Sequence, residues 1–485
     1  MPPVPVRPDA TAEGFDADVI VIGGGSAGAA AARRLVDAGA SVLLLEAGET
    51  DANPAIHDNA RMHELWGSDE DWGYQTVPQR HANGRRMGLP RGKVLGGSSS
   101  LNGTIWVRGA REDFDAWAYG GAEGWAWDDV LPVFRRIESH DRGASDLHGA
   151  EGPIAVLSEY EPDPIHAALI EATVQAGIPR NPDYTGGVLD GVAPMQLNVR
   201  DGSRASTSQA YLLPIAEDPR LLVLTGAHVT RVLIEGGRAV GVQWRRGGAL
   251  ERAAAGEVIV AAGAIGSPLV LMLSGVGPAA HLAEHGIDVV ADLPGVGANL
   301  HDHVLAPVIC TAEREVAPPT PPRPACGSHF WVRSRPGLLV PDLQPLYFSV
   351  PLAEPWMTLP TQNAVTLYSG LVRPASRGSV RLTGPGVDDE PAIDLGALSC
   401  RADLEAIVAG LELIRGIVEQ PALADWGLRP AYPAPELAGA ELEDYVRDTL
   451  VTYHHQAGTC RIGIDAGAVV DPRLRVHGIE GLRVA

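Results

Sequence analysis

The chain of 485 residues has few cysteines, few aromatic residues and far fewer basic than acidic side chains. Its four cysteines form no C-x-x-C pair, which argues against a zinc or dithiol redox site; they are Cys310, Cys326, Cys400 and Cys460. We therefore expect reduced, structural thiols in a cytoplasmic protein. Lys+Arg 38 against Asp+Glu 60 gives a net charge of −22, which argues against nucleic acid or an anionic membrane as a partner.

Long hydrophobic segments are also missing. No run of about 18 apolar residues lacks charge, proline or repeated glycine. Residues 1–18 contain no apolar segment, so we expect no signal peptide. No G-x-S-x-G follows a strand, which disfavours a Ser-His-Asp hydrolase. With Phe 5 and Tyr 10, no aromatic cage for a quaternary ammonium is evident, so choline is not the favoured substrate.

The composition is that of a globular protein with more than one domain. The chain is 45% hydrophobic and 20% charged, and it is too long for one ordinary core. We therefore expect an α/β protein with at least two domains.

Residues 17–46 predict a strand, a tight turn, a helix and a second strand. Gly23, Gly25 and Gly28 fit G-x-G-x-x-G, in which a pyrophosphate lies on the amides at the helix start, here Ser26 and Ala27. Glu46 ends the second strand, where a carboxylate accepts ribose hydroxyls and repels the 2′-phosphate of NADP. The motif by itself does not choose between FAD and NAD.

A second glycine-rich run covers residues 91–108. It can offer bare backbone amides to an anion or a flat ring, although an ordinary glycine-rich loop has the same composition. Its candidate cofactor residues are Arg91, Gly96, Gly97, Ser98, Asn102 and Gly103.

Later segments predict a discontinuous nucleotide domain and a sheet domain. A buried strand at 257–263 returns to a helix that Ser267 and Pro268 open over 269–274. Prolines crowd residues 313–345, which predicts an exposed loop or lid. Residues 346–382 alternate as an antiparallel sheet does, and 403–419 and 441–450 have helical periodicity.

These stretches together resemble the glucose–methanol–choline (GMC) family of FAD-dependent oxidoreductases. The resemblance is collinear and rests on residues 23–28 with Glu46, 91–108, 263–278, 293–303, and the Tyr453-His454 pair with Gly458-Thr459. It implies a Rossmann-type FAD-binding domain (1–155, 215–300 and 452–485) and an α+β substrate domain with an antiparallel sheet (156–214 and 301–451).

The resemblance also implies roles for particular residues. Val229 would contact adenine through its backbone, Ala262 and Gly263 would lie along the nucleotide, and His454 would be the catalytic histidine. Some family members tether FAD to a histidine where this chain has Leu101, so we expect non-covalent FAD. The family's chain continues beyond the position of Ala485 to a second catalytic His or Asn, which is expected outside this sequence.

The function implied is oxidation of an alcohol to a carbonyl, with hydride transfer to flavin N5 and His454 as the base. The electron acceptor, oxygen or another, stays open. Alternatives are a hydroxynitrile lyase on the same fold, an amino-sugar or polyol dehydrogenase of secondary metabolism, and an inactive flavin-poor scaffold if the C-terminus is truly short. Candidate substrate contacts are Asp342, Gln344, Phe348 and His455. His301, Asp302 and His303 are interpreted as structural, and no metal is expected.

Overall fold

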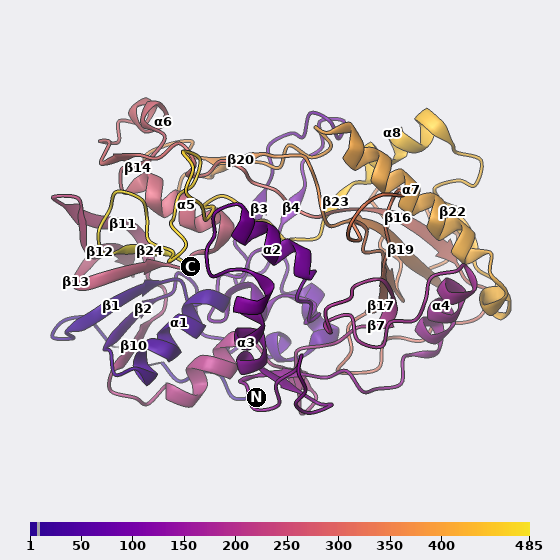
Figure 1. Cartoon of the computed structure of the whole chain (residues 1–485), viewed down its shortest axis with the longest axis horizontal. Coiled ribbons are helices and arrows are strands. Elements are labelled where there is room, and N and C mark those ends of the chain that lie inside the picture. The colour runs from indigo at the N-terminus through magenta and orange to yellow at the C-terminus, as the bar shows by residue number, and fades with distance from the viewer. Residues whose placement is uncertain (7–9) are drawn as a thin grey trace.

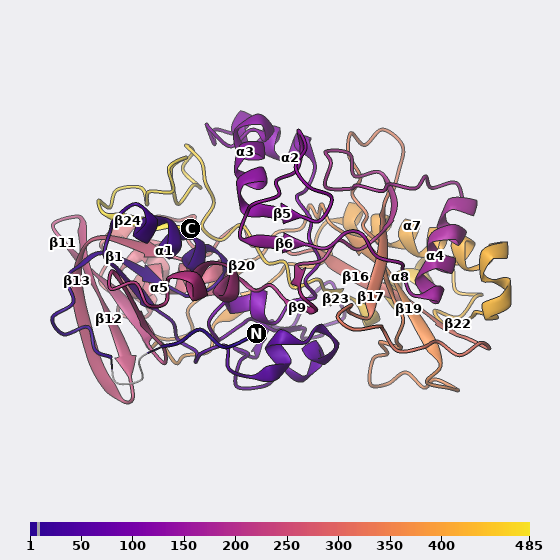
Figure 2. The ribbon, with the colours of Figure 1, turned by 90° about the horizontal axis from the view of Figure 1, so that it is seen from below.

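Two large sheets lie at opposite ends of the long axis of the molecule (Figure 1). This computed structural model describes residues 1–6 and 10–485. Helices α2 (Arg111–Tyr119) and α3 (Trp127–Ile137) lie between the sheets. Figure 2 shows these two helices on one side of the middle region and the N-terminus on the other. Within the described residues, no helix is both long and apolar enough to cross a bilayer.

The first sheet has the order β10-β2-β1-β13-β12-β11, with β24 also paired to β13. Strands β10, β2, β1, β13 and β24 are parallel, while β12 and β11 continue as an antiparallel meander. Every residue of β2 is buried, as a strand covered on both faces requires. The bounds are β1 Ala17–Ile22, β2 Val42–Leu45, β10 Leu221–Leu224, β11 His228–Glu235, β12 Arg238–Arg246, β13 Ala249–Val260 and β24 Leu482–Val484.

Helix α1 (Ser26–Asp37) connects β1 to β2 and packs on both strands. Its buried alanines and glycine let the helix approach the sheet closely. The predicted strand, turn, helix and strand over 17–46 is therefore confirmed, with helix and strand ends shifted by a few residues.

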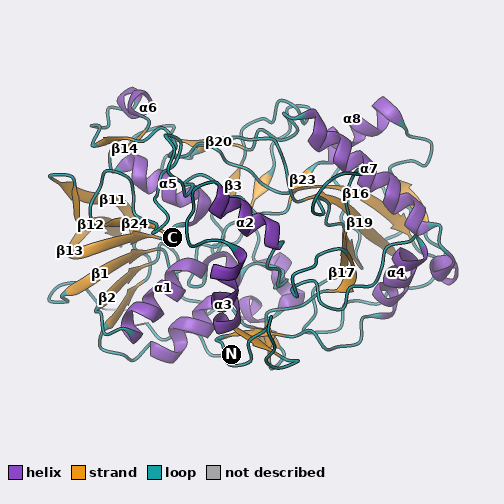
Figure 3. Ribbon diagram, viewed as in Figure 1, coloured by secondary structure: helices purple, strands orange, loops and turns teal. Residues whose placement is uncertain are grey.

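The second sheet is antiparallel and has the order β22-β16-β19-β18-β17-β7, with β23 paired to β16. Figure 3 shows helices α4, α7 and α8 gathered at this end of the molecule, where they share one core with the sheet. The bounds are β7 Gly191–Pro194, β16 Val304–Thr311, β17 Cys326–Trp331, β18 Leu346–Phe348, β19 Ala364–Leu371, β22 Arg429–Tyr432, β23 Val451–Thr452, α4 Pro164–Gln175, α7 Arg401–Val418 and α8 Gly439–Thr449.

The remaining elements are short apart from α5. The helices are α5 Gly263–Leu273, α6 Ala279–Glu284, η1 Pro54–His57, η2 Asn59–Glu64, η3 Gly97–Ser100, η4 Ser208–Leu212, η5 Leu213–Ile215 and η6 Pro421–Trp426. The strands are β3 Tyr74–Gln75, β4 Gly88–Leu89, β5 Glu138–His140, β6 Ile154–Val156, β8 Val199–Arg200, β9 Ser203–Arg204, β14 Val276–Gly277, β15 Ala291–Asp292, β20 Ser379–Arg381 and β21 Ala392–Asp394.

Two expectations about local structure need correction. The range 313–345 is not one continuous loop, because the largely buried strand β17 lies inside it and pairs with β7 and β18. No proline of this range lies within β17 itself, and the aromatic residues Phe330 and Trp331 of β17 suit a strand. Helix α5 begins at Gly263 and not near Leu269, so Pro268 lies within it.

Pro268 is tolerated inside α5 because a side chain replaces the missing helical donor. Proline has no N–H, so the carbonyl of Ala264, four residues earlier, lacks its usual helical partner. The hydroxyl of Thr459 donates to this carbonyl across 2.5 Å. The helix of the nucleotide region is thereby connected to the segment that carries His454.

Candidate active site

The turn after β1 has the shape of a pyrophosphate-binding turn. Gly23 has φ +99°, and a Cβ there would lie 2.5 Å from the carbonyl oxygen of Ala261. A Cβ at Gly28 would lie 1.8 Å from the carbonyl oxygen of Gly23, so glycine is required there too. Ser26 and Ala27 are exposed at the start of α1, where amides have no helical acceptor. An anion can therefore reach these amides.

Glu46 lies directly beside this turn. Its carboxylate accepts the amides of Gly24 at 2.8 Å and Gly48 at 2.9 Å. Burial raises the pKa of Glu46 to about 7, against the lowering effect of these amides and of the Lys93 charge. A carboxylate has about four acceptor positions, so Glu46 retains capacity to accept a ribose hydroxyl.

The glycine-rich run packs its backbone against the same turn. The amide of Gly96 donates to the carbonyl of Gly24, and a Cβ at Gly97 would lie 2.8 Å from Cα of Gly25. Gly92 donates to the Ser98 hydroxyl at 3.2 Å. The structure therefore brings the two predicted glycine segments together into one cradle.

Asn102 and Gly103 continue this cradle. Asn102 is exposed, and its side-chain oxygen accepts from the guanidinium of Arg204 at 2.7 Å and the amide of Thr104 at 2.9 Å. Arg204 is 1% exposed, and burial lowers its pKa to about 9. This arginine was not predicted from the sequence, because its partner Asn102 lies about 100 residues away in the chain.

Three further predicted cofactor residues lie at the edges of the cradle. Val229 is buried in β11, two residues after Ala227, whose amide donates to the carbonyl of Glu46. Ala262 caps α5 and Gly263 begins it, next to the Ala261 carbonyl that approaches Gly23. Gly263 is exposed with φ +74°, and a Cβ there would meet no atom within 4 Å.

These features fit a dinucleotide such as FAD. A pyrophosphate binds where glycines leave no room for a Cβ and the start of a helix is exposed, and a ribose binds a carboxylate beside that turn. This structure has all three features. The predicted cofactor residues of 23–46 and 91–103 are therefore close together, with Arg91 as an exception described below.

The predicted catalytic segment forms a bulge between two strands. Tyr453 donates its amide to the carbonyl of His303, and His301 and Ala457 exchange both backbone hydrogen bonds. Residues 454–456 therefore face the single residue Asp302. Such bulges redirect side chains and are common beside active sites.

His454 adopts φ +65°, which is rare for a residue that is not glycine. Its ring makes an edge contact with Trp66, with centroids 5.2 Å apart, and its Nδ1 is buried with no partner among the described residues. Burial, followed by the charge of Arg91, lowers the pKa of His454 to about 3. The ring is therefore neutral near pH 7.

His455 has a different environment. Its ring is exposed, and its Nδ1 lies 3.1 Å from Nδ1 of His303. Water reaches the ring, but protein atoms still surround it closely enough that desolvation and then the Arg91 charge lower its pKa to about 4. Burial also lowers the pKa of His303 well below its usual value.

Arg91 contacts the histidine bulge and connects it to the cradle. Its guanidinium donates to the backbone carbonyl of His454, and its own amide donates to Asp71 at 2.8 Å. Arg91 was predicted as a cofactor residue, and this contact with His454 was not predicted.

Of the candidate substrate residues, Phe348 lies in β18, while Asp342 and Gln344 precede that strand in the chain. Both carboxylate oxygens of Asp342 are taken by the amide and hydroxyl of Ser334, at 2.7 and 2.6 Å. The side-chain amide of Gln344 donates to Nδ1 of His329 at 2.9 Å, and the backbone carbonyl of Gln344 accepts from the Tyr453 hydroxyl. Phe348 makes an edge contact with Tyr368. Asp342 is thus occupied within its own turn, while Gln344 reaches the histidine segment.

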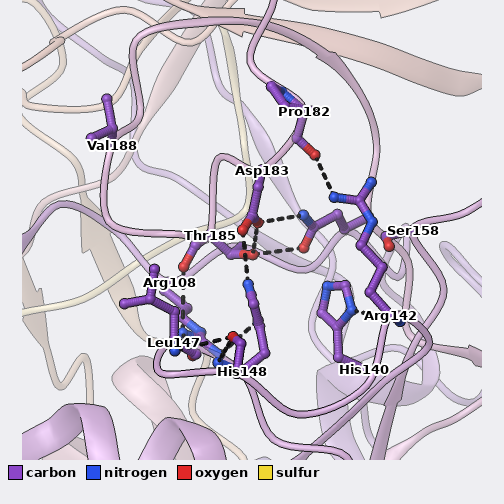
Figure 4. A network of polar contacts seen from close by, with 12 residues as sticks. Arg108, His140, Arg142, Leu147, His148, Ser158, Pro182, Asp183, Thr185 and Val188 are labelled. Atoms are coloured by element: carbon purple, nitrogen blue, oxygen red, sulfur yellow. Dashed lines mark hydrogen bonds and ion pairs between the residues drawn. The ribbon is translucent and has the colours of Figure 1, made fainter.

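A second polar network lies outside this site (Figure 4). His148 lies 2.8 Å from Glu138 and 2.9 Å from Asp183, one ring nitrogen to each carboxylate, and Arg108 also pairs with Glu138. His148 therefore bridges the carboxylates of Glu138 and Asp183, and Arg108 shares Glu138 with it.

Two groups of described residues bring potential metal ligands within 4.8 Å of one another: Glu138, His140 and His148, and separately His281, Glu284 and His285. In the first group, the guanidinium of Arg108 already occupies the cation position beside Glu138. Neither group includes the predicted catalytic residues.

Comparison with known proteins identifies the family. The N-terminal GMC oxidoreductase model matches residues 17–305, and the C-terminal GMC oxidoreductase model matches residues 374–485. The chain is 36% identical to an alcohol dehydrogenase [acceptor] of Pseudomonas putida, over 96% of this chain and 90% of the relative. It is 37% identical to an oxygen-dependent choline dehydrogenase of Brucella suis, over 97% of this chain and 90% of that relative.

Solved structures of GMC-like flavoenzymes have the same fold as this chain. A pyridoxine 4-oxidase from Mesorbium loti superposes with a TM-score of 0.93 at 34% identity, covering 97% of this chain and 93% of that one. An Aspergillus oryzae formate oxidase, solved to examine modification of its FAD, has a TM-score of 0.89 at 26% identity, with the same coverage.

The fold and the site thus define an FAD-dependent oxidoreductase that acts on CH–OH groups. The chain belongs to the GMC oxidoreductase family. The predictions of family, fold, FAD as cofactor and alcohol oxidation at this general level are confirmed.

Proposed function

We propose that the enzyme oxidises a small alcohol to a carbonyl, with a histidine of the 454–455 pair as the base. The observation that carries this proposal is the bulge, which presents two neutral histidines and is connected to the glycine cradle through Arg91. When bound, FAD supplies the hydride acceptor at flavin N5. The alcohol loses its hydroxyl proton to the histidine and a hydride from the same carbon, which leaves the carbonyl.

The surroundings favour His455 over His454 as the base, although the sequence pointed to His454. His303 hydrogen-bonds the backbone of Val372 and faces His455 through Nδ1. If Nε2 of His303 donates to the Val372 carbonyl, Nδ1 of His303 accepts and Nδ1 of His455 donates. Nε2 of the exposed His455 ring then has a free lone pair that can accept the alcohol proton.

His454 then has a supporting role, with its ring against Trp66. We retain it as the second candidate because its Nδ1 is unpartnered among the described residues. Single substitutions separate the two. If His455 is the base, His455→Ala slows flavin reduction by a saturating alcohol at least 100-fold, and His454→Ala slows it less. The reverse order would assign the base to His454.

We propose that the substrate is a primary or secondary alcohol on a small organic molecule. The named relatives act on choline and alcohols and a structural neighbour acts on pyridoxine, so a panel of choline, pyridoxine, benzyl alcohol and an amino sugar samples these chemistries. Anaerobic bleaching of the flavin by one member identifies the substrate class. Reoxidation of the reduced enzyme in air then separates an oxidase from a dehydrogenase. Flavin that no member bleaches would count against the proposal.

We further propose that FAD is bound without a covalent bond and that the two sheets belong to separate domains with the predicted boundaries. Leu101 is 3% exposed and offers no nucleophile. Acid precipitation should therefore release all the FAD into the supernatant, whereas yellow colour in the pellet would reveal a covalent bond. The boundaries of the substrate-domain segment 156–214 are approximate. Helix η4 lies within this segment but packs on α1, which belongs to the FAD-binding domain.

A further inference from the structure

The histidine bulge encloses one buried carboxylate. Asp302 is 4% exposed and lies opposite residues 454–456, where the two strands separate. Its Oδ1 accepts the amide of His455 at 2.8 Å, and its Oδ2 accepts the hydroxyl of Thr452 and the side-chain amide of Gln456. Asp302 therefore replaces the strand pairing that the bulge removes.

Thr452 extends this support to the next residue. Its hydroxyl oxygen accepts the amide of His454 at 2.7 Å while its hydrogen goes to Asp302. The amides of both histidines thus depend on one carboxylate, directly for His455 and through one hydroxyl for His454. The backbone of His454 has φ +65°, which costs about 1–3 kcal/mol and persists only where neighbouring contacts hold it.

The guanidinium of Arg91 contacts the side of the bulge opposite Asp302. Arg91 donates to the carbonyl of His454, and Arg91 and Asp302 each shift the other's pKa through their charges. The histidine bulge therefore lies between a carboxylate from the sheet region and a guanidinium from the cofactor cradle.

We propose that Asp302 is a positioning residue that fixes this bulge and so directs the histidine rings toward the reacting alcohol. The inference rests on the proposed function, and it assigns a role to a residue that the sequence analysis interpreted as only structural. Misplacing a catalytic group by about 1 Å costs roughly 100-fold in rate. Asp302 therefore affects the chemical step more than it affects substrate or FAD binding.

Asp302→Leu in the holoenzyme is the direct test, because leucine keeps a similar volume and removes every acceptor. Asparagine is a weaker probe, since Oε1 of Gln456 has no partner among the described residues and could turn to meet a new amide. We expect unchanged FAD content, a 10- to 100-fold slower flavin reduction at saturating alcohol, and KM within about threefold of wild type.

Asp403→Leu is the matched control. Asp403 is also 4% exposed and accepts two amides, those of Ala375 and Ser376, each at 2.8 Å. It lies in the first turn of α7, and its hydrogen bonds go to residues 375 and 376 and not to residues 452–456. We expect a loss of stability similar to that of Asp302→Leu and a normal rate of flavin reduction. Equal rates for the two variants would overturn the proposal.

The pH profile gives a readout that a purely structural role would not change. Burial raises the pKa of Asp302 to about 6, so its protonation weakens the support of the bulge below that pH. We expect wild-type flavin reduction to lose rate with a midpoint near pH 6 and Asp302→Leu to lack this step. A step that persists in the variant belongs to another group and would contradict the proposal.

Two further measurements keep the test decisive. If Asp302→Leu does not fold, Thr452→Val removes one donor to Asp302 and should slow flavin reduction by a smaller factor with FAD retained. Hydrogen exchange of residues 451–458 should be faster in either variant than in wild type. If no alcohol reduces the wild-type flavin, the proposed function fails, and exchange alone then decides whether Asp302 fixes the bulge.

Discussion

The hydroxyl of Thr459 donates to the carbonyl of Ala264 across 2.5 Å, at the position in α5 where Pro268 supplies no amide. This bond joins the segment that carries His454 and His455 to helix α5. A hydrogen bond of this kind contributes about 1 kcal/mol, and leaving a buried carbonyl unpaired costs about 1–3 kcal/mol.

Thr459→Val should therefore lower the free energy of unfolding by about 1–3 kcal/mol and weaken FAD binding. Urea unfolding and FAD titration of the apoprotein measure the two effects. Thr449→Val is the control, because the Thr449 hydroxyl donates to the carbonyl of Tyr445 within α8, far from the cradle. An FAD affinity that falls equally in both variants would contradict the coupling.

Gly97→Ala should abolish stoichiometric FAD. The new Cβ would lie 2.8 Å from Cα of Gly25, and Gly97 has φ +52°, so the two halves of the cradle must separate. The ratio of absorbance at 450 nm to that at 280 nm reports the loss.

Gly416→Ala provides the comparison for that substitution. Gly416 lies within α7, and its Cβ would meet nothing within 4 Å, so alanine should stabilise the protein by up to about 1 kcal/mol. Its FAD content should match wild type. Full FAD occupancy in Gly97→Ala would show that the close contact with Gly25 is not needed.

Glu46→Gln should change the pH dependence of stability. The pKa of Glu46 is about 7 in the folded protein and ordinarily 4.5, so its favourable contribution is complete below pH 4.5 and is lost as the pH rises to 7. Glutamine does not titrate. Relative to wild type, the variant apoprotein should therefore gain roughly 3 kcal/mol between pH 4.5 and 7.5, at about 1.4 kcal/mol per pKa unit.

Urea unfolding of both apoproteins at several pH values measures this difference. The same variant should bind FAD more weakly, because the amide has one acceptor fewer for the ribose. A stability difference that stays constant with pH would show that Glu46 is not a buried, titrating group.

The sequence predicted the strand, turn, helix and strand of residues 17–46 well because their requirements are local. A glycine at positive φ, a buried apolar strand and a carboxylate at the end of the next strand all lie within residues 17–46. The pairing of Gly25 with Gly97 is not local, and only the family resemblance connected the two segments.

The histidine bulge could not be predicted by pattern. It depends on strand pairing between 301–305 and 451–457, which are about 150 residues apart. Asp302 was therefore interpreted as structural, and His455 was predicted only as a candidate substrate contact. β17 was missed for a related reason, since the nearby prolines dominated the composition of 313–345.

The most direct test of the account is anaerobic stopped-flow reduction of the bound flavin by the alcohol that bleaches it, in wild type, His454→Ala and His455→Ala. We predict rapid bleaching in wild type, a loss of at least 100-fold in His455→Ala and a smaller loss in His454→Ala, with FAD retained in all three. Bleaching at wild-type rate in both variants would contradict the claim that a histidine of this bulge takes the alcohol proton.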